Sequence, residues 1–225
     1  MADQVVRVDV RTGYDLWSQS YEERSSTLVH LDRRVTPRHL RARPGERILD
    51  AGCGTGGHLG LIRRAAAVAI GLDFSGGMLA VARRSHRREA LIQADLNQPL
   101  PVRDSVFDAV LCSLVSEHLT DLPAFFAELR RLLRPAGRLV FSAFHPAMAA
   151  AGVEANFESG GTEYRLGAEL HTVEDYRRDM ADAGFENLRE SEYEVDATLV
   201  AVAPAARKDL GEPLLLMIEA ERGQR

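Results

Sequence analysis

A glycine-rich loop after the first clear strand constrains the fold of this chain more than any other feature. Residues 47–51 (RILDA) have the pattern of a buried strand, and Gly52, Gly54 and Gly56 follow it directly. Glycine allows a tight turn and lets a ligand approach the main chain where a Cβ atom would clash. The helical pattern that comes next would direct its free N–H groups at the same place, which favours anionic or strongly polar groups. The loop therefore predicts a ligand site at the end of a strand.

The loop alone does not identify the ligand. Gly52, Gly54 and Gly57 also satisfy the G-x-G-x-x-G pattern of dinucleotide-binding proteins, so a nicotinamide or flavin cofactor is one alternative. A tight turn without a ligand is another. Asp73 lies at the end of the second predicted strand. Its carboxylate is suited to accept hydrogen bonds from both hydroxyls of a ribose, or to cap the next helix. It does not decide between cofactors, because adenosine occurs in more than one of them.

Asp95 and Leu96 narrow the choice. They end the third predicted strand, where the carboxylate could accept from an adenine amino group and the leucine could cover the ring. The alternative is a turn-forming aspartate before Asn97. An NAD-dependent oxidoreductase would explain the glycines and Asp73, but it leaves this acid and the late strands unexplained.

Strands and helices alternate through the middle of the chain. Alternation at this spacing indicates βαβ units and a parallel sheet, whose short strands are apolar because both faces are buried. Ser75 is the predicted N-cap of one helix, and Thr172 begins a capping box before another. We expect strands at 47–51, 67–73, 90–95, 106–112, 138–143, 188–195 and 214–218, with helices at 75–84, 121–134, 174–183 and near 197–210.

Length, composition and charge exclude several classes of protein. With 225 residues, 45% of them hydrophobic and 27% charged, the chain suits one globular domain with a modest insertion. It contains no run of about 18 apolar residues and no secretory signal, which predicts a cytoplasmic protein without a membrane span. Two cysteines are too few for a disulfide framework or a structural zinc site. The net charge of −5 argues against a general nucleic-acid binder.

Taken together, these motifs resemble those of class I S-adenosylmethionine-dependent methyltransferases. Residues 48–56 resemble motif I, and Asp73, Asp95 with Leu96, residues 107–110 and residues 132–139 resemble the later motifs in order and spacing. The resemblance covers roughly residues 45–145 and is nearest to the small-molecule group that includes ubiquinone/menaquinone-type and natural-product enzymes. It implies a Rossmann-like α/β fold, with a mostly parallel seven-stranded sheet, one late antiparallel strand and helices on both faces.

The resemblance also implies where S-adenosylmethionine would bind. The loop glycines would lie along its methionine moiety, Asp73 would hold the ribose, and Asp95 with Leu96 would flank the adenine. Residues past the fourth strand would line the site near the sulfonium, and two tyrosines at 13–21, a stretch similar to the N-terminal helix of the group, would cover the cofactor. Cys53 is expected to be a small filler, not a nucleophile. The expected cofactor residues are Tyr14, Tyr21, Asp50, Gly52, Cys53, Gly54, Asp73, Phe74, Met78, Asp95, Leu96, Ser113 and Leu114.

Two histidines are candidate catalytic bases. A methyl group on a cationic sulfur is already activated, so the protein mainly supplies position, and a base is needed only if the acceptor must lose a proton. His145 is preferred because it follows the fifth strand, and strand ends of open α/β sheets face the ligand crevice; it could instead only order its loop. His118 is weaker, because Glu-His-Leu is a common helix start in the resembling family. No cluster of metal ligands is evident, so we expect no metal.

The predicted organisation is an N-terminal helical cap over residues 1–44 and a methyltransferase domain over 45–225, with an acceptor-pocket insert at about 145–171. The expected activity is methyl transfer to O, N or C of a small organic acceptor, by a monomer or homodimer without nucleic-acid or membrane partners. A methyltransferase-like fold used for another reaction, such as cyclisation, is an alternative, because fold does not fix function. Nucleic-acid methylation is less favoured, because no Asn-Pro-Pro-aromatic or Asp-Pro-Pro-aromatic motif follows the fourth strand.

Overall fold

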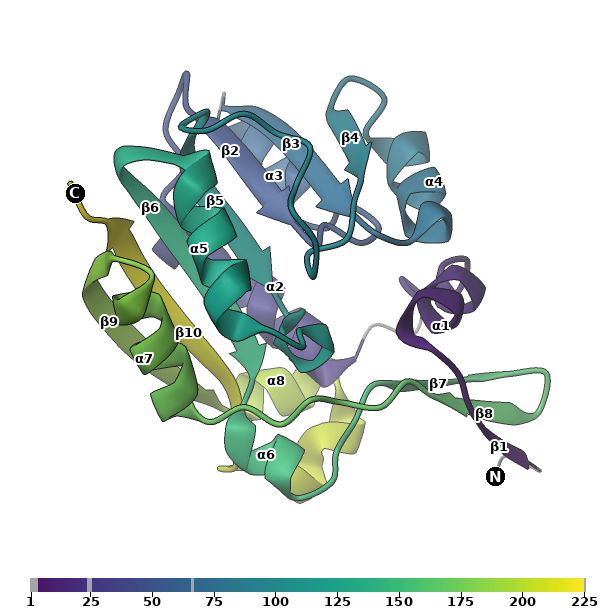
Figure 1. Cartoon of the computed structure of the whole chain (residues 1–225). Helices are drawn as coiled ribbons and strands as arrows, with labels where there is room; N and C mark the ends of the chain where they lie inside the picture. The colour runs from purple at the N-terminus through teal and green to yellow at the C-terminus, as the bar shows by residue number, and fades with distance from the viewer. Residues whose placement is uncertain (1–3, 24–25, 66, 225) are drawn as a thin grey trace.

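A computed structural model describes residues 4–23, 26–65 and 67–224. At its centre, seven strands form one sheet in the order β4-β3-β2-β5-β6-β10-β9 (Figure 1). Neighbouring strands are parallel except along β10, which runs antiparallel to both β6 and β9. This sheet confirms the predicted Rossmann-like α/β fold. Its strands are β2 (Arg47–Ala51), β3 (Val68–Asp73), β4 (Ala90–Gln93), β5 (Phe107–Ser113), β6 (Leu133–Phe144), β9 (Phe185–Glu194) and β10 (Pro213–Arg222).

The order of the strands determines where a ligand can bind. The chain moves outward from β2 to β3 and β4, and then crosses back to place β5 on the other side of β2. The carboxyl ends of β2, β3 and β5 lie at one edge of the sheet, because Ala51 is in register with both Leu72 and Cys112. In open α/β sheets, ligands bind in the crevice where the strand order reverses. The edge formed by β2 and β5 is therefore the expected position of the site.

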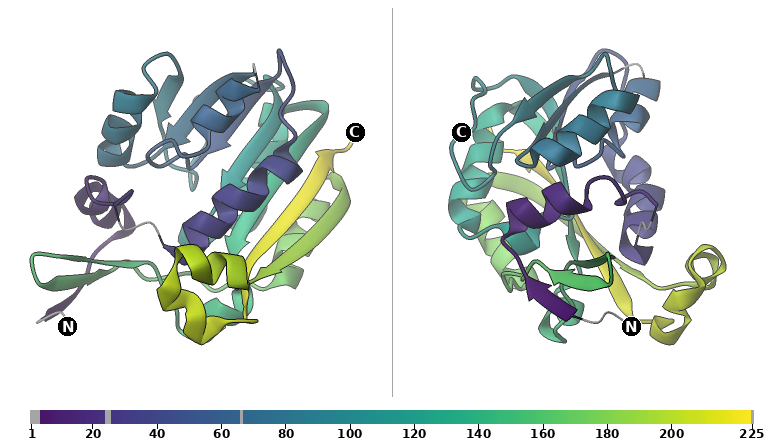
Figure 2. Two further views of the ribbon diagram at one scale, coloured as in Figure 1. Left: turned by 180° about the vertical axis from the view of Figure 1, so that it is seen from behind. Right: turned by 90° about the vertical axis from the view of Figure 1, so that its right-hand side faces the viewer.

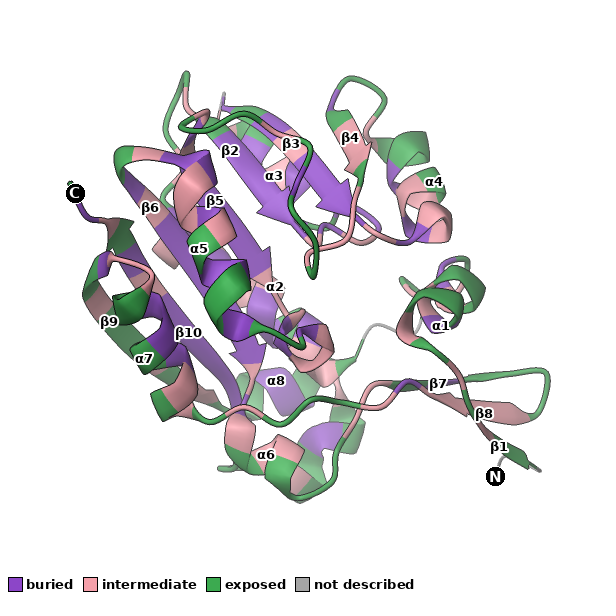
Figure 3. Ribbon diagram, in the orientation of Figure 1, coloured by how far each residue is buried: buried purple, intermediate pink, exposed green. Residues whose placement is uncertain are grey.

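Helices cover both faces of the sheet, and β2 shows why its strands are apolar throughout. Successive side chains of a strand point to opposite faces. Ile48 belongs to the apolar cluster formed with α2, α3 and α8, whereas Leu49 belongs to the cluster formed with α5 and α7. The central strands are therefore buried on both sides (Figure 3). The helices of the main domain are α2 (Thr27–Leu40), α3 (Leu59–Arg64), α4 (Gly76–Ser85), α5 (Leu122–Leu132), α7 (Val173–Asp182) and α8 (Ala197–Val202), with 3-10 turns η1 (Ser116–His118) and η2 (Pro204–Asp209).

The predicted helix caps are confirmed, whereas the predicted start of β6 differs from the structure. The Ser75 side chain accepts a hydrogen bond from the Met78 N–H at 3.0 Å and begins α4. Thr172 forms the predicted capping box at the start of α7. By contrast, β6 begins at Leu133 instead of residue 138, because a register shift in its pairing with β5 accommodates the intervening turn.

A second, three-stranded sheet stands apart from the main one (Figures 1 and 2). Two of its strands form a hairpin within the 145–171 insert, and β1 pairs with that hairpin in parallel. The sequence indicated helices alone for residues 1–44, so β1 is an addition to that prediction; residues 1–3 and 24–25 lie outside the described ranges. The elements of this region are β1 (Gln4–Arg7), α1 (Val10–Trp17), α6 (Pro146–Ala150), β7 (Asn156–Ser159) and β8 (Thr162–Arg165). No helix in the described ranges has the length and apolar character needed to cross a bilayer.

Candidate active site

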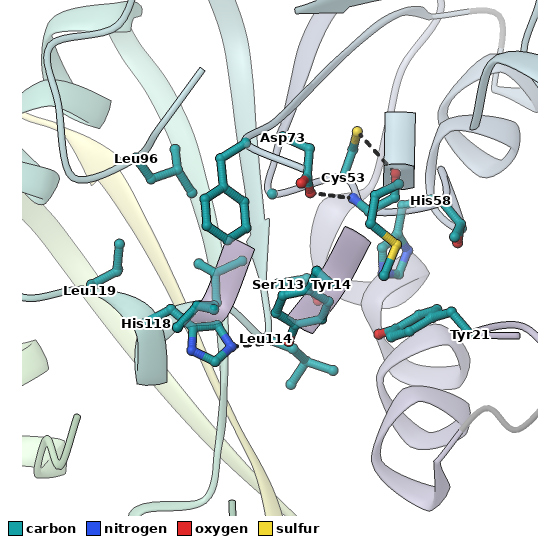
Figure 4. A pocket seen from close by; sticks show the side chains of 18 of the residues that line it. Tyr14, Tyr21, Cys53, His58, Asp73, Leu96, Ser113, Leu114, His118 and Leu119 are labelled. Carbon is teal, nitrogen blue, oxygen red and sulfur yellow. Dashed lines mark hydrogen bonds between the residues drawn. The ribbon is translucent and has the colours of Figure 1, made fainter. Parts of the chain in front are cut away.

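A cavity of about 330 Å³ lies at the carboxyl ends of β2, β3 and β5, and α1 and the segment after it contribute to its lining (Figure 4). Residues from five separate segments of the sequence meet there. All predicted cofactor positions except Asp50 line the cavity, and so does His118, whereas His145 does not. The predicted residues that the structure brings together are Tyr14, Tyr21, Gly52, Cys53, Gly54, Asp73, Phe74, Met78, Asp95, Leu96, Ser113 and Leu114.

The glycine loop forms one wall of the cavity, and its conformation explains the glycines. Gly52 has a φ of +83° and a Cβ atom there would lie 2.3 Å from Val115 Cγ1, so no other residue fits. Gly54 has a φ of +52°, but a Cβ atom there would meet nothing within 4 Å, so its open side is available to a ligand. Burial raises the pKa of the Cys53 thiol, which is consistent with its expected role as a filler.

Asp73 holds the glycine loop and faces the cavity. Its two carboxylate oxygens accept from the N–H groups of Gly54 and Ser75, at 2.8 and 2.9 Å. Each oxygen retains acceptor capacity for a further hydrogen bond, as a ribose diol would require. Burial raises the pKa of this carboxyl, and the backbone N–H groups oppose that rise. The ribose role and the turn-capping role predicted from the sequence are therefore compatible at the same residue.

Asp95 and Leu96 form the far wall. The Asp95 carboxylate accepts from the Asn97 N–H at 3.0 Å, which is the turn role, and lies 3.6 Å from an Arg11 guanidinium nitrogen. The same guanidinium is 5.5 Å from the centre of the Phe74 ring. An arginine of α1, an aromatic ring and a carboxylate therefore meet at this end of the cavity.

Helix α1 closes the cavity and is fixed by specific contacts. Asp15 accepts hydrogen bonds from the Ser75 hydroxyl and the Gly77 N–H, at 2.5 and 2.8 Å, so α1 caps the N-terminus of α4. Tyr14 points to the other side, and its hydroxyl is 3.0 Å from His118 Nε2 (Figure 4). Trp17 stacks on Phe157 of the insert hairpin with ring centres 5.1 Å apart. The N-terminal segment and the insert thus meet above the cavity.

Comparisons with known proteins agree with this arrangement. Residues 49–141 match the family described as a methyltransferase domain. The malonyl-[acyl-carrier protein] O-methyltransferase of Serratia marcescens is 41% identical over 99 residues, which are 44% of this chain and 38% of that protein. The demethylmenaquinone methyltransferase of Tropheryma whipplei (strain Twist) is 33% identical over 144 residues, 61% of this chain and 60% of that one. The matches thus span 38% and 60% of these two relatives' length.

Two solved structures share the fold. An S-adenosylmethionine-dependent methyltransferase from Mesorhizobium loti has a TM-score of 0.69 and 23% identity, covering 88% of this chain and 99% of that one. The [4+2]-cyclase SpnF has a TM-score of 0.64 and 20% identity, covering 86% of this chain and 80% of its own. This chain therefore contains a segment, residues 49–141, that matches a methyltransferase domain, and it has the fold of the S-adenosylmethionine-dependent methyltransferases. S-adenosylmethionine is the cofactor named for the Mesorhizobium loti structure.

Asp50 is a buried carboxyl directly before the glycine loop. Asp50 is 1% exposed, and neither of its oxygens has a hydrogen-bond partner in the described part of the chain. Burial raises its pKa to about 7, and the charge of His58 opposes that rise. An unpartnered acid directly before the glycine loop is the complement expected of an ammonium group or an ordered water that bridges to one.

Arg33 brings a positive charge to the cavity lining, and no motif in the sequence predicted it. Its guanidinium lines the cavity beside Gly57 and binds both carboxylate oxygens of Glu22 at 2.7 and 2.8 Å. The Thr55 hydroxyl donates to the same Glu22 carboxylate. The end of the cavity next to the glycine loop therefore combines a cation with the open backbone at Gly54.

Asp32 and His58 are a second pair that sequence reasoning missed. His58 Nε2 lies 2.7 Å from one Asp32 oxygen, and the other oxygen accepts from the hydroxyls of Ser113 and Ser142 at 2.7 and 2.8 Å. Burial opposes ionisation of both groups, but their hydrogen bond and mutual attraction lower the pKa of Asp32 and raise that of His58. The hydrogen bonds of Asp32 tie α2 to the ends of β5 and β6. One sequence feature could have revealed Asp32: it is an acid on the buried face of α2, between Leu31 and Val35.

The two candidate bases lie in different places. His118, on η1, lines the cavity, and burial lowers its pKa to about 4, so its imidazole is neutral at pH 7. His145 instead begins α6, accepts from the Ala147 N–H at 3.3 Å, and approaches Glu192 of β9 at 3.6 Å. The expectation that His145 would face the ligand is wrong, because α6 starts directly at this residue and holds the ring outside the cavity. No group of three or more His, Cys, Asp or Glu side chains suited to a metal occurs among the described residues.

Proposed function

We propose that this methyltransferase transfers the methyl group of S-adenosylmethionine to an O, N or C atom of a small organic acceptor. The observation that supports the proposal is one shared cavity of about 330 Å³, in which the expected cofactor residues and the Tyr14–His118 pair lie together. A cavity covered by α1 suits a small molecule better than a polymer. The relative named demethylmenaquinone methyltransferase, with a small-molecule acceptor in its name, also supports this choice.

His118 is the residue that we propose to contact the acceptor. The cofactor supplies an activated methyl group, so the protein must mainly align the attacking atom with it. A neutral imidazole can hold an acceptor O–H or N–H, and Tyr14 fixes the ring through the 3.0 Å contact. A pKa near 4 makes His118 a weak base, so its role is to orient the acceptor more than to remove its proton.

We propose the cytoplasm as the location and a monomer or homodimer as the working form, without nucleic-acid or membrane partners. Cys53 and Cys112 are both free and buried, which a reducing compartment permits. Natural-product biosynthesis is the proposed biological setting, and the sequence resemblance supports it.

A ligand-binding and turnover experiment tests the proposal. S-adenosylhomocysteine should raise the melting temperature of the protein, whereas NADH at the same concentration should not. The loaded enzyme should then release S-adenosylhomocysteine from S-adenosylmethionine in the presence of an acceptor from a panel of phenols, amines and activated carbon acids. Stabilisation by NADH alone would contradict the proposal. Conversion of a substrate without release of S-adenosylhomocysteine would favour cyclisation, the reaction named for the neighbour SpnF.

A further inference from the structure

A second, much smaller cavity lies under the insert, next to the cofactor cavity. Its volume is about 20 Å³, enough for one polar group the size of a water or an ammonium ion. Its walls are largely apolar and come from the end of β6, α6, the insert and α7: Phe144, Pro146, Ala149, Val153, Ala155 and Tyr176. Its polar lining residues are Ser116 and Glu117 of η1, together with Glu154, Glu169 and His171.

The turn η1 separates the two cavities. Val115 and His118 line the cofactor cavity, whereas Ser116 and Glu117 line the small one. The Glu117 carbonyl accepts from the Glu169 N–H at 2.8 Å, so the insert is fastened to the same turn. The cavity therefore lies one turn away from the residue that we propose to orient the acceptor.

Glu117 is the unusual residue of this cavity. Its Oε2 atom is shielded from solvent and has no hydrogen-bond partner in the described part of the chain. Burial raises the pKa of this carboxyl to about 7. Burial raises the pKa of Tyr14 most, and the charge of Glu117 raises it further.

No cation faces Glu117 from the lining of the small cavity. Neither lysine nor arginine is among its described lining residues. Glu154 is paired with Arg7 and Arg165 at 3.4 and 3.7 Å, and His171 contacts the Leu119 carbonyl at 3.0 Å. A carboxylate oxygen that is shielded from solvent and has no partner is costly, and an ammonium group placed beside it removes that cost.

We propose that the small cavity binds a protonated amino group of the acceptor, with Glu117 as the residue that recognises it. The inference rests on the proposed methyl-transfer function and specifies the acceptor as an amine-bearing molecule. The amino group is the anchor, and the rest of the acceptor extends past η1 towards His118. When the ammonium group binds to the protonated acid, the Glu117 proton leaves to solvent and a carboxylate–ammonium pair remains.

The test compares amines with uncharged molecules of the same shape. The full-length protein, saturated with S-adenosylhomocysteine, is titrated with butylamine, 2-phenylethylamine and the matching alcohols, 1-butanol and 2-phenylethanol. We expect at least one amine to bind at least tenfold more tightly than its alcohol. At pH 6, the heat of amine binding should depend on the ionisation enthalpy of the buffer, because Glu117 releases its proton.

Two variants separate Glu117 from its surroundings. Glu117→Gln should still bind S-adenosylhomocysteine but lose the preference for the amine and the proton release. Glu169→Gln removes an exposed acid that lines the same cavity and should retain both. Equal binding of amines and alcohols, absence of binding by every amine, or an unchanged preference in Glu117→Gln would overturn the inference. Failure of the unmodified protein to bind S-adenosylhomocysteine would instead remove the proposed function.

Discussion

The two sides of the active site are built in different ways. On the cofactor side, Gly52, Gly54 and Asp73 belong to a strand–loop–strand unit whose hydrogen bonds link residues close in sequence, such as Gly54 and Asp73. On the acceptor side, the contacts join distant segments, as in the Tyr14–His118 pair and the parallel pairing of β1 with β8. The cofactor side is therefore encoded by one strand–loop–strand unit, whereas the acceptor side depends on α1 and the insert meeting correctly.

The largest expected effect is on the cofactor side. Gly52→Ala places a Cβ atom 2.3 Å from Val115 Cγ1 at a positive φ, so the loop must move away from the cofactor. Strain of about 3 kcal/mol would weaken binding of S-adenosylhomocysteine roughly a hundredfold, as measured by calorimetric titration. Gly45→Ala is the matched control, because Gly45 also has a positive φ but a Cβ atom there meets nothing within 4 Å. Equal losses of affinity in both variants would contradict the specific role of Gly52 in shaping the cofactor loop.

Next in size is an effect confined to the acceptor side. His118→Ala should lower kcat roughly tenfold, the value of one hydrogen bond to the acceptor, and leave the affinity for S-adenosylhomocysteine nearly unchanged. His145→Ala should retain kcat, because His145 lies outside the cavity at the start of α6. Steady-state kinetics with an acceptor found by the turnover screen measures both variants. A larger loss in His145→Ala than in His118→Ala would reverse the assignment.

The buried acid on the cofactor side makes a pH-dependent prediction. The pKa of Asp50 is raised from 3.8 to about 7, so the folded protein binds this proton more tightly than the unfolded chain. The stability linked to that proton is fully present below about pH 4 and is lost as the pH rises through 7. Asp50→Asn should therefore melt roughly 2–8 °C higher than the cofactor-free parent protein at pH 9, a gain of about 1–2 kcal/mol, and the gap should close towards pH 4. A gap that is constant with pH would show that Asp50 does not titrate in this range.

The smallest expected effect tests how α1 meets the insert. Phe157→Leu removes the ring that stacks on Trp17 at 5.1 Å and on Tyr164 at 5.0 Å. Aromatic pairs contribute about 0.5–1.5 kcal/mol each, so KM for the acceptor should rise a few-fold. Affinity for S-adenosylhomocysteine should change less, because Phe157 does not line the cofactor cavity. An unchanged KM for the acceptor together with weaker binding of S-adenosylhomocysteine would assign the hairpin to the cofactor side.

The same division explains what could be predicted from the sequence. The alternating strands and the loop glycines carry local signals, since a buried strand, a cap and a positive-φ glycine each require particular residue types nearby. Asp73, Asp95 and Leu96 were predicted for the same reason, because they follow strand ends. The rule about strand ends failed only for His145, where a helix begins at once and changes the direction of the ring.

The missed features depend on contacts between distant residues. Asp32 reads as an ordinary helical acid until the fold places it against His58, Ser113 and Ser142. β1 has only four residues, and its partner strand lies beyond residue 160. It is therefore too short for an alternating apolar pattern to identify it as a strand. Glu117 could be placed at the end of a strand, but its lack of a partner is a property of the packed insert.

A crystal structure of the complex with S-adenosylhomocysteine tests the central claim most directly, because it shows both sides of the site at once. We predict that the ribose hydroxyls contact Asp73, that the amino group of the homocysteine moiety lies on the Asp50 side of the glycine loop, and that the sulfur faces Tyr14 and His118. A ligand with its sulfur directed away from this pair, or one bound outside the cavity at the ends of β2 and β5, would contradict the account.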